Sequence, residues 1–115
     1  MAILSSHFLN AVDGSHAASV EVTLVHIAPE GTRQTVFVDA SDDGGRFSRD
    51  FGAFAEGSYE MVIASGAYFR QFSLPQQGHQ ILSEICIRFT MPDPDGRYHI
   101  PVIMAPHSYS CWWSQ

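Results

Sequence analysis

The sequence contains no lysine: all six basic residues are arginines, and they face twelve acidic residues. A chain without a primary side-chain amine has no lysine nucleophile and forms no Schiff base, which excludes that kind of covalent catalysis. The formal net charge of −6 at pH 7 disfavours binding to nucleic acid or to an anionic membrane surface. We therefore expect no nucleic-acid partner and no membrane partner.

Cysteine is also scarce, with only Cys86 and Cys111 in the chain. Two isolated cysteines do not make a disulfide framework, and the spacings typical of zinc sites are absent. We expect both to be buried free thiols. His16, His26 and His79 lie scattered without the spacing of metal ligands, so we expect no metal and no other cofactor.

Long apolar runs are missing as well. No apolar run approaches a length of about 18 residues, which would suggest a membrane span. The sequence also does not begin with the basic region and apolar region of a signal peptide. We therefore expect an intracellular, cytoplasmic protein. A chain of 115 residues is long enough for one core but not for two, which predicts a single domain over residues 1–115.

What the sequence does contain is a series of short segments in which apolar and polar residues alternate, separated by turn signals. This pattern is typical of an all-β sandwich. The expected strands are Val20–Ile27, Thr35–Val38, Tyr59–Ala64 and Ile81–Phe89, after a short opening at Ser5–Asn10. Loops are expected at residues 12–15 and 41–45 because both are rich in Asp and Gly. The one segment expected to be helical is Ser65–Gln71.

The last part of the chain is predicted to fold back on itself. Its two extended runs are Tyr98–Ala105 and Ser108–Trp113. They flank Pro106, and a proline between apolar runs is typical of a turn. Residue pairs whose numbers sum to about 214 should then face each other. This register places His99 opposite Gln115 and Pro101 opposite Trp113, so an imidazole and the chain end share one surface. His107 is expected to be a turn residue.

This stretch resembles the end of the transthyretin and hydroxyisourate hydrolase family. The similar segments are Tyr98-His99-Ile100-Pro101, Ala105-Pro106 and Ser108-Tyr109-Ser110 near the end, Ser5-Ser6-His7-Phe8-Leu9 at the start, and Asp43-Gly44-Gly45-Arg46, Gly57-Ser58-Tyr59-Glu60 and Gly66-Ala67-Tyr68-Phe69 between them. The resemblance covers nearly the whole chain. It implies a transthyretin-like (prealbumin-like) β-sandwich of about eight strands with one short helix.

The resemblance also implies a catalytic role for His7, Arg46 and His99, which stand at the family's motif positions. Opening a cyclic amide needs a base that takes a proton from water, and an imidazole titrates near neutral pH. A guanidinium can bind an anionic, urate-like ring or stabilise a developing oxyanion. Which imidazole is the base stays open. Taken singly, each histidine is more often a strand residue, and Arg46 more often a solvated loop charge.

The chain departs from the family at its end. The hydrolases close with Tyr-Arg-Gly-Ser, whereas this chain closes with Trp112-Trp113-Ser114-Gln115, and Asn10 stands where the opening motif usually has Asp. At Trp113 a positive charge with five donors is replaced by an indole with one donor. We expect all four terminal residues to bind substrate, with Trp113 on the side of His99. For Trp112, packing in the core or at a subunit interface is an equal alternative.

Three functions are open at this point. The first is a diverged hydroxyisourate hydrolase-like enzyme that uses histidine acid–base chemistry to open, isomerise or cyclise a more apolar or aromatic cyclic small molecule. The second is an authentic 5-hydroxyisourate hydrolase of purine (urate) degradation, since losing one charge-assisted contact costs about 1.5–3 kcal/mol and need not abolish activity. The third is a non-enzymatic transthyretin-like small-molecule binder, which would need neither His7 nor His99.

The resemblance further implies a homotetramer, arranged as a dimer of dimers, that binds its small-molecule substrate in a channel between subunits. The run Cys111-Trp112-Trp113 agrees with this expectation, because an apolar and aromatic patch is unusual on the surface of a small monomer.

Overall fold

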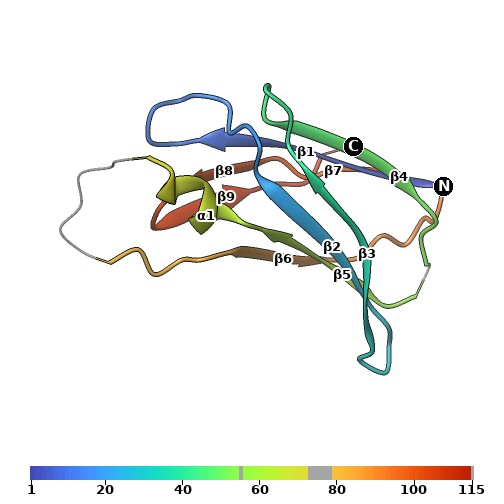
Figure 1. Ribbon diagram of the computed structural model, residues 1–115. Coiled ribbons are helices and arrows are strands. Elements are labelled where there is room, and N and C mark those ends of the chain that lie inside the picture. The colour runs from blue at the N-terminus through green and yellow to red at the C-terminus, as the bar shows by residue number, and fades with distance from the viewer. Residues whose placement is uncertain (55, 73–78, 115) are drawn as a thin grey trace.

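The computed structural model describes residues 1–54, 56–72 and 79–114 and contains nine strands and one short helix in these ranges (Figure 1). In chain order they are β1 (Ala2–Asn10), β2 (Glu21–Ile27), β3 (Arg33–Ala40), β4 (Arg46–Phe51), β5 (Ser58–Ile63), α1 (Ser65–Arg70), β6 (Ile85–Phe89), β7 (Arg97–His99), β8 (Val102–Ala105) and β9 (Ser108–Cys111). The predicted all-β class and the single short helix are confirmed. No helix in the described ranges has the length and hydropathy needed to cross a bilayer.

Two sheets form the layers of a sandwich (Figure 1). One sheet contains β4, β1, β8 and β9 in that order, and β7 also pairs with β1. In this sheet β1 is antiparallel to β4 and parallel to both β7 and β8. The other sheet has the order β3-β2-β5-β6 and is antiparallel throughout. The first strand of the chain is therefore held in place by strands from the end of the chain.

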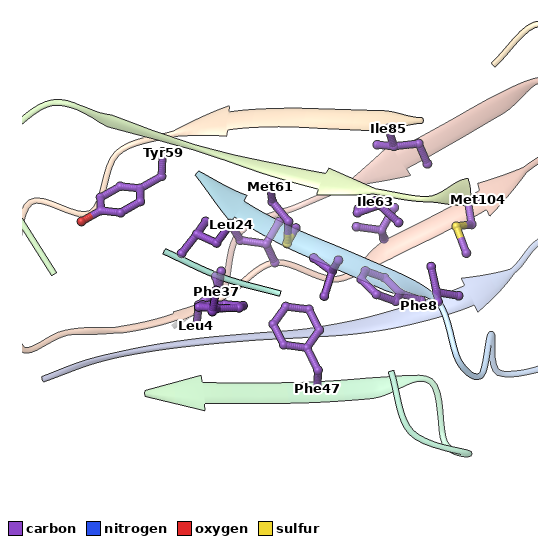
Figure 2. Close-up of a cluster of buried hydrophobic side chains, with 14 of the residues drawn as sticks. Leu4, Phe8, Leu24, Phe37, Phe47, Tyr59, Met61, Ile63, Ile85 and Met104 are labelled. Carbon is purple, nitrogen blue, oxygen red and sulfur yellow. The ribbon is translucent and has the colours of Figure 1, made fainter. Parts of the chain in front are cut away.

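Side chains from both sheets fill the space between the layers. Buried and partly exposed residues alternate along the whole of β1, and Leu4 and Phe8 are fully buried. Leu24 of β2 and Met61 of β5 reach the same space from the facing sheet (Figure 2). Because successive side chains of a strand point to opposite faces, the odd-numbered residues of β1, including His7, face outward.

The strands differ most from the prediction in three places, besides shifts of a few residues at the ends of β1, β3, β5 and β9. β4 was not predicted, because only Phe47 and Phe51 of its six residues are buried and the rest are exposed. β6 begins at Ile85, and Ile81, where the strand was expected to begin, is 82% exposed. The run predicted as Tyr98–Ala105 forms two strands, β7 and β8, which are separated at Pro101, a residue with no N–H to give to a ladder.

The C-terminal hairpin is confirmed, since β8 and β9 pair in antiparallel fashion around Pro106-His107. Its register differs by one residue from the prediction. Paired numbers sum to 213, as for Val102 with Cys111, and His99 bridges to Ser114 rather than to Gln115. Gln115 itself lies outside the described residues. A slip of one residue turns the side chains of a strand to the other face, so the register decides which terminal residues meet His99.

Cys86 and Cys111 are free thiols but exposed, so the expectation of burial is wrong. Both lie on strands, β6 and β9, that form sheet edges among the described residues, with a neighbouring strand on one side only. Cys86 follows the buried Ile85 and therefore points away from the core. All four residues of β9 are exposed, Cys111 among them.

Candidate functional site

The outward face of the sheet that contains β1 carries all three residues expected to be catalytic. His7 pairs with Arg46 across β1 and β4, and Ser5 pairs with His99 across β1 and β7. Ser5 and His7 are two residues apart on one strand, so their side chains point to the same face. Strand pairing therefore gathers His7, Arg46 and His99 onto one surface.

Ser5 holds the imidazole of His99. The Ser5 hydroxyl oxygen lies 2.8 Å from Nδ1 of His99. Since Nδ1 is engaged, Nε2 is the ring nitrogen left for water or substrate. The adjacent Ser6 points to the other face and donates its hydroxyl to the Ile100 carbonyl oxygen at 2.6 Å. Consecutive serines of β1 thus fix both the His99 side chain and the backbone that follows it.

His7 has a partner that was not predicted from the sequence. Its Nε2 lies 2.9 Å from Nδ1 of His16, a histidine expected to have no role. Burial is the main cause that lowers the pKa of His7, and the positive charge of Arg46 adds to it. His16 and His99 act in the same direction, and a hydrogen bond with the Gly44 backbone opposes them. The lowered pKa favours the neutral form of His7 near pH 7.

A tight turn before β4 positions Arg46 on this face of the sheet. Oδ1 of Asp42 accepts hydrogen bonds from the backbone N–H groups of Gly44 and Arg46, both at 2.9 Å. Gly45 has a φ of +76°, and a Cβ atom there would lie 2.4 Å from the Phe8 carbonyl oxygen. Only glycine fits both conditions. The Asp-Asp-Gly-Gly sequence therefore packs the turn directly against β1 beside His7.

A polar groove runs along this face, and we define it by Ser5, Arg46, Ser48, Arg97 and His99. One part, of about 240 Å³, is lined by Arg46 together with Ser5, Ser48 and His99. The adjoining part, of about 320 Å³, shares those three residues and is lined by Arg97 as well. Guanidinium groups thus stand in both parts of the groove. Arg97 was not identified from the sequence, although its place two residues before His99 on one strand was the available signal.

The terminal tryptophans lie on opposite faces of this sheet. The Trp113 ring lies 5.3 Å from that of Tyr98, and both line a separate apolar hollow of about 460 Å³. The predicted position of Trp113 beside His99 is therefore wrong, because the register is shifted by one residue. Ser114 instead exchanges backbone hydrogen bonds with His99 at 2.9 and 3.3 Å. Trp112 precedes Ser114 by two residues, so alternation makes it the aromatic residue on the groove side.

Asn10, where the opening motif usually has Asp, faces away from the groove. It is buried, and its amide nitrogen donates to the Tyr68 hydroxyl of α1 at 3.2 Å. Its amide oxygen accepts from the Val12 backbone N–H at 2.8 Å. In this chain Asn10 therefore joins β1 to the helix and to the following loop, and it does not contact the groove.

The other histidines lie elsewhere. His26 is buried, contacts the Glu56 carbonyl oxygen through Nε2 at 2.9 Å, and stacks on Phe54 with ring centroids 4.5 Å apart. His107 is exposed in the hairpin turn, as expected. Within the described ranges, no group of three or more His, Cys, Asp or Glu side chains is arranged to hold a metal ion. Of the histidines expected to have no role, His16 is the one that reaches the groove face.

The sequence of residues 4–113 matches the family model of the HIUase/Transthyretin family. The chain belongs to this family. Among its relatives, the 5-hydroxyisourate hydrolase of Deinococcus radiodurans is 31% identical over 112 residues, which cover 95% of this chain and 92% of the relative. Family membership and hydrolase relatives support an enzymatic, hydroxyisourate hydrolase-like character for this member.

Two solved structures extend the comparison. An (S)-allantoin synthase superposes with a TM-score of 0.84 at 26% identity, and the match covers 99% of this chain but only 44% of that longer chain. Sea bream transthyretin in complex with thyroxine superposes with a TM-score of 0.81 at 21% identity, over 96% of this chain and 93% of that one. The latter likeness shows a shared fold, and it confirms the transthyretin-like sandwich expected from the sequence.

Proposed function

We propose that this HIUase/Transthyretin family member is an enzyme that uses histidine acid–base chemistry on a cyclic small molecule bound in the polar groove. The observation that carries the proposal is the convergence of His7, Arg46 and His99 on one face, with the His99 ring held by Ser5. A binder of apolar ligands has no need of two imidazoles and a guanidinium placed together. The 5-hydroxyisourate hydrolases among its relatives support the same choice.

The proposed reaction is hydrolysis of a ring amide. Nε2 of His99 takes a proton from water while the water oxygen attacks the ring carbonyl carbon. Arg46 stabilises the negative charge that develops on the carbonyl oxygen. The ring C–N bond then breaks, the leaving nitrogen receives the proton from His99, and the product carries a new carboxylate. His7 lies beside Arg46 with its Nε2 engaged by His16, so in this reaction it acts through its neighbours and not by direct contact with the substrate.

The groove favours a flat, anionic ring over a purely apolar one. Arg46 pairs with His7 and Arg97 pairs with Ile3, so their strand positions are about 13 Å apart along β1 at about 3.3 Å per residue. A substrate between them can contact a guanidinium on either side. Trp112 is 45% exposed and lies on the groove side by alternation, although it is not among the residues that line the groove. We propose that a ligand in the groove also contacts this indole, where the family's hydrolases have Tyr. We therefore propose that the substrate differs from that of the family's hydrolases in the part that lies near Trp112.

A second candidate is an authentic 5-hydroxyisourate hydrolase. It is favoured by the name of the Deinococcus radiodurans relative, whose match spans nearly both chains. The two candidates share the chemistry above and differ in the substrate. Turnover of freshly generated 5-hydroxyisourate at rates typical of enzymes, about 1–10³ s⁻¹, would favour this second candidate over a changed substrate.

We also propose a homotetramer, a dimer of dimers in which the groove faces a channel between subunits. Trp112 and Trp113 are 45% and 52% exposed in the single chain. Large aromatic surfaces of this kind are usually covered in the working assembly.

The deciding experiment compares His99→Asn with His107→Asn, using hydroxyisourate and a panel of cyclic amides and ureas. Asn keeps hydrogen-bonding capacity but cannot titrate near neutral pH. We expect His99→Asn to lower turnover by about 10²–10⁴-fold and to leave ligand affinity nearly intact. His107→Asn is the matched control, because His107 is an exposed turn residue, and it should retain full activity. Equal activity of both variants would contradict the enzymatic proposal and favour a binder.

A further inference from the structure

His16 is an exposed residue, yet the backbone around it is fixed to the strand that carries His7. His16 itself forms a bridge with Leu9 of β1. On one side of it, the Ser15 carbonyl oxygen accepts from the Asn10 N–H at 2.8 Å. On the other side, the Ala17 N–H donates to the Phe8 carbonyl oxygen at 2.9 Å. The loop after β1 therefore folds back and holds the His16 side chain over the outward face.

The two imidazoles form a bonded pair. His7 Nε2 and His16 Nδ1 are 2.9 Å apart, and the ring planes differ by 26° with centroids 5.0 Å apart. A hydrogen bond between two imidazoles needs one N–H donor and one bare nitrogen acceptor, so their tautomers must be complementary. One added proton still leaves a donor and an acceptor at the bond. A second added proton would place two donors against each other.

We propose that His7 and His16 act as a proton-sharing pair, in which His16 is a positioning residue that, together with the Gly44 backbone, fixes the tautomer of His7 and connects it to solvent. The pair holds one extra proton readily and resists a second. The pairing stands on the geometry alone, whereas its effect on turnover rests on the proposed function. The hydrogen-bonding direction of His7 is then already set before a substrate binds in the neighbouring groove.

Charged groups from each element around the pair bear on its protonation. Arg46 on β4 and His99 on β7 are close enough to disfavour a charge on His7. Asp42, in the turn before β4, uses one carboxylate oxygen for two backbone N–H groups. Asp13, in the loop that carries His16, is engaged by the N–H and hydroxyl of Ser15. The positive charges of Arg46 and His99 therefore disfavour a proton on His7. The carboxylates of Asp42 and Asp13 are hydrogen-bonded to other donors in their own turns.

The test is a side-chain ¹⁵N NMR titration of the unliganded full chain between about pH 5 and pH 8.5, a window centred on histidine titration. Wild type is compared with His16→Gln and with His107→Gln as the matched control. In wild type we expect His7 and His16 to titrate in two coupled steps and to keep one tautomer each at high pH. In His16→Gln, His7 should titrate in a single step with its midpoint at higher pH, because in wild type the exposed His16 takes the first extra proton and its charge disfavours the second on His7. His107→Gln should match wild type.

The result that would overturn the proposal is a His7 midpoint and tautomer that are the same in His16→Gln as in wild type, or two independent wild-type titrations. His16→Asn provides a second neutral variant, and a native-like backbone amide spectrum shows that each variant is folded. No substrate is needed, so this outcome is decided whether or not the proposed enzyme activity exists.

A kinetic measurement then links the pair to turnover. With hydroxyisourate as the probe, the acid limb of the kcat/KM profile is set by the base His99 and by protonation of His7. The His7 contribution should move to higher pH in His16→Gln, and the alkaline plateau should be retained. A merely structural role of His16 would lower the plateau and leave the limb in place. Absence of turnover in wild type would count against the proposed function, and the titration would still decide the pairing.

Discussion

At the scale of single residues, alternation along a strand decides which side chains meet the ligand. Arg97 and His99 stand two apart on β7, and both line the groove. Tyr98, between them, also borders the groove, but its ring packs against Trp113 on the opposite face. A guanidinium is therefore available to the groove even though position 113 carries an indole.

The two terminal tryptophans allow a matched comparison. We expect Trp112→Ala to weaken binding of an aromatic or urate-like ligand by about three- to tenfold, since a specific aromatic contact contributes about 0.5–1.5 kcal/mol. Trp113→Ala should leave that affinity unchanged, because its ring contacts Tyr98 on the other face. Isothermal titration calorimetry on both variants is the measurement. A larger loss in Trp113→Ala would contradict the observed register.

The residues of the site were predictable to different degrees. His7, Arg46 and His99 could be found because each lies in a segment that resembles a family motif. His16 could not, since its contact with His7 depends on a loop that returns to β1 through backbone hydrogen bonds. Trp113 was misplaced because both faces of the hairpin carry apolar residues, so hydrophobic alternation did not fix the register.

At the scale of elements, one-sided burial determined which strands were predictable. In β2 the buried Val22 and Leu24 alternate with more exposed residues, and this pattern is visible in the sequence. β4 buries only Phe47 and Phe51, four residues apart, so it shows no alternation. The start of β6 was also mispredicted, because Ile81 continues the alternation of the strand without being part of it.

The turn before β4 gives a second matched comparison. Gly45→Ala and Gly14→Ala both place a side chain at positive φ, +76° and +79°, which costs about 1–2 kcal/mol. At Gly14 no atom of the residues that the structure describes lies within 4 Å of the added Cβ, whereas at Gly45 the Phe8 carbonyl oxygen is 2.4 Å away. We expect Gly45→Ala to lower the free energy of unfolding by a further ~1–3 kcal/mol. Urea denaturation of both variants measures this, and equal losses would contradict the tight packing.

At the scale of the whole molecule, the groove and the terminal aromatic residues lie on exposed surface of a single chain. We expect four chains of 12.7 kDa to associate in solution, because covering this surface removes large aromatic side chains from water. Multi-angle light scattering at micromolar concentration checks the mass. A stable 12.7 kDa monomer would contradict the proposed channel between subunits and would leave the groove open to solvent.

The central place of β1 has a consequence for protein synthesis. Ser5 and His99 are 94 positions apart, so β1 leaves the ribosome long before β7 and β8 exist to pair with it. At about 5–20 residues per second, this delay lasts about 5–20 s. During that time one edge of β1 has no partner strand, and an open strand edge can pair with other chains. The face that carries the groove is therefore the last part of the molecule to be completed, and a nascent chain stopped before residue 97 has no groove.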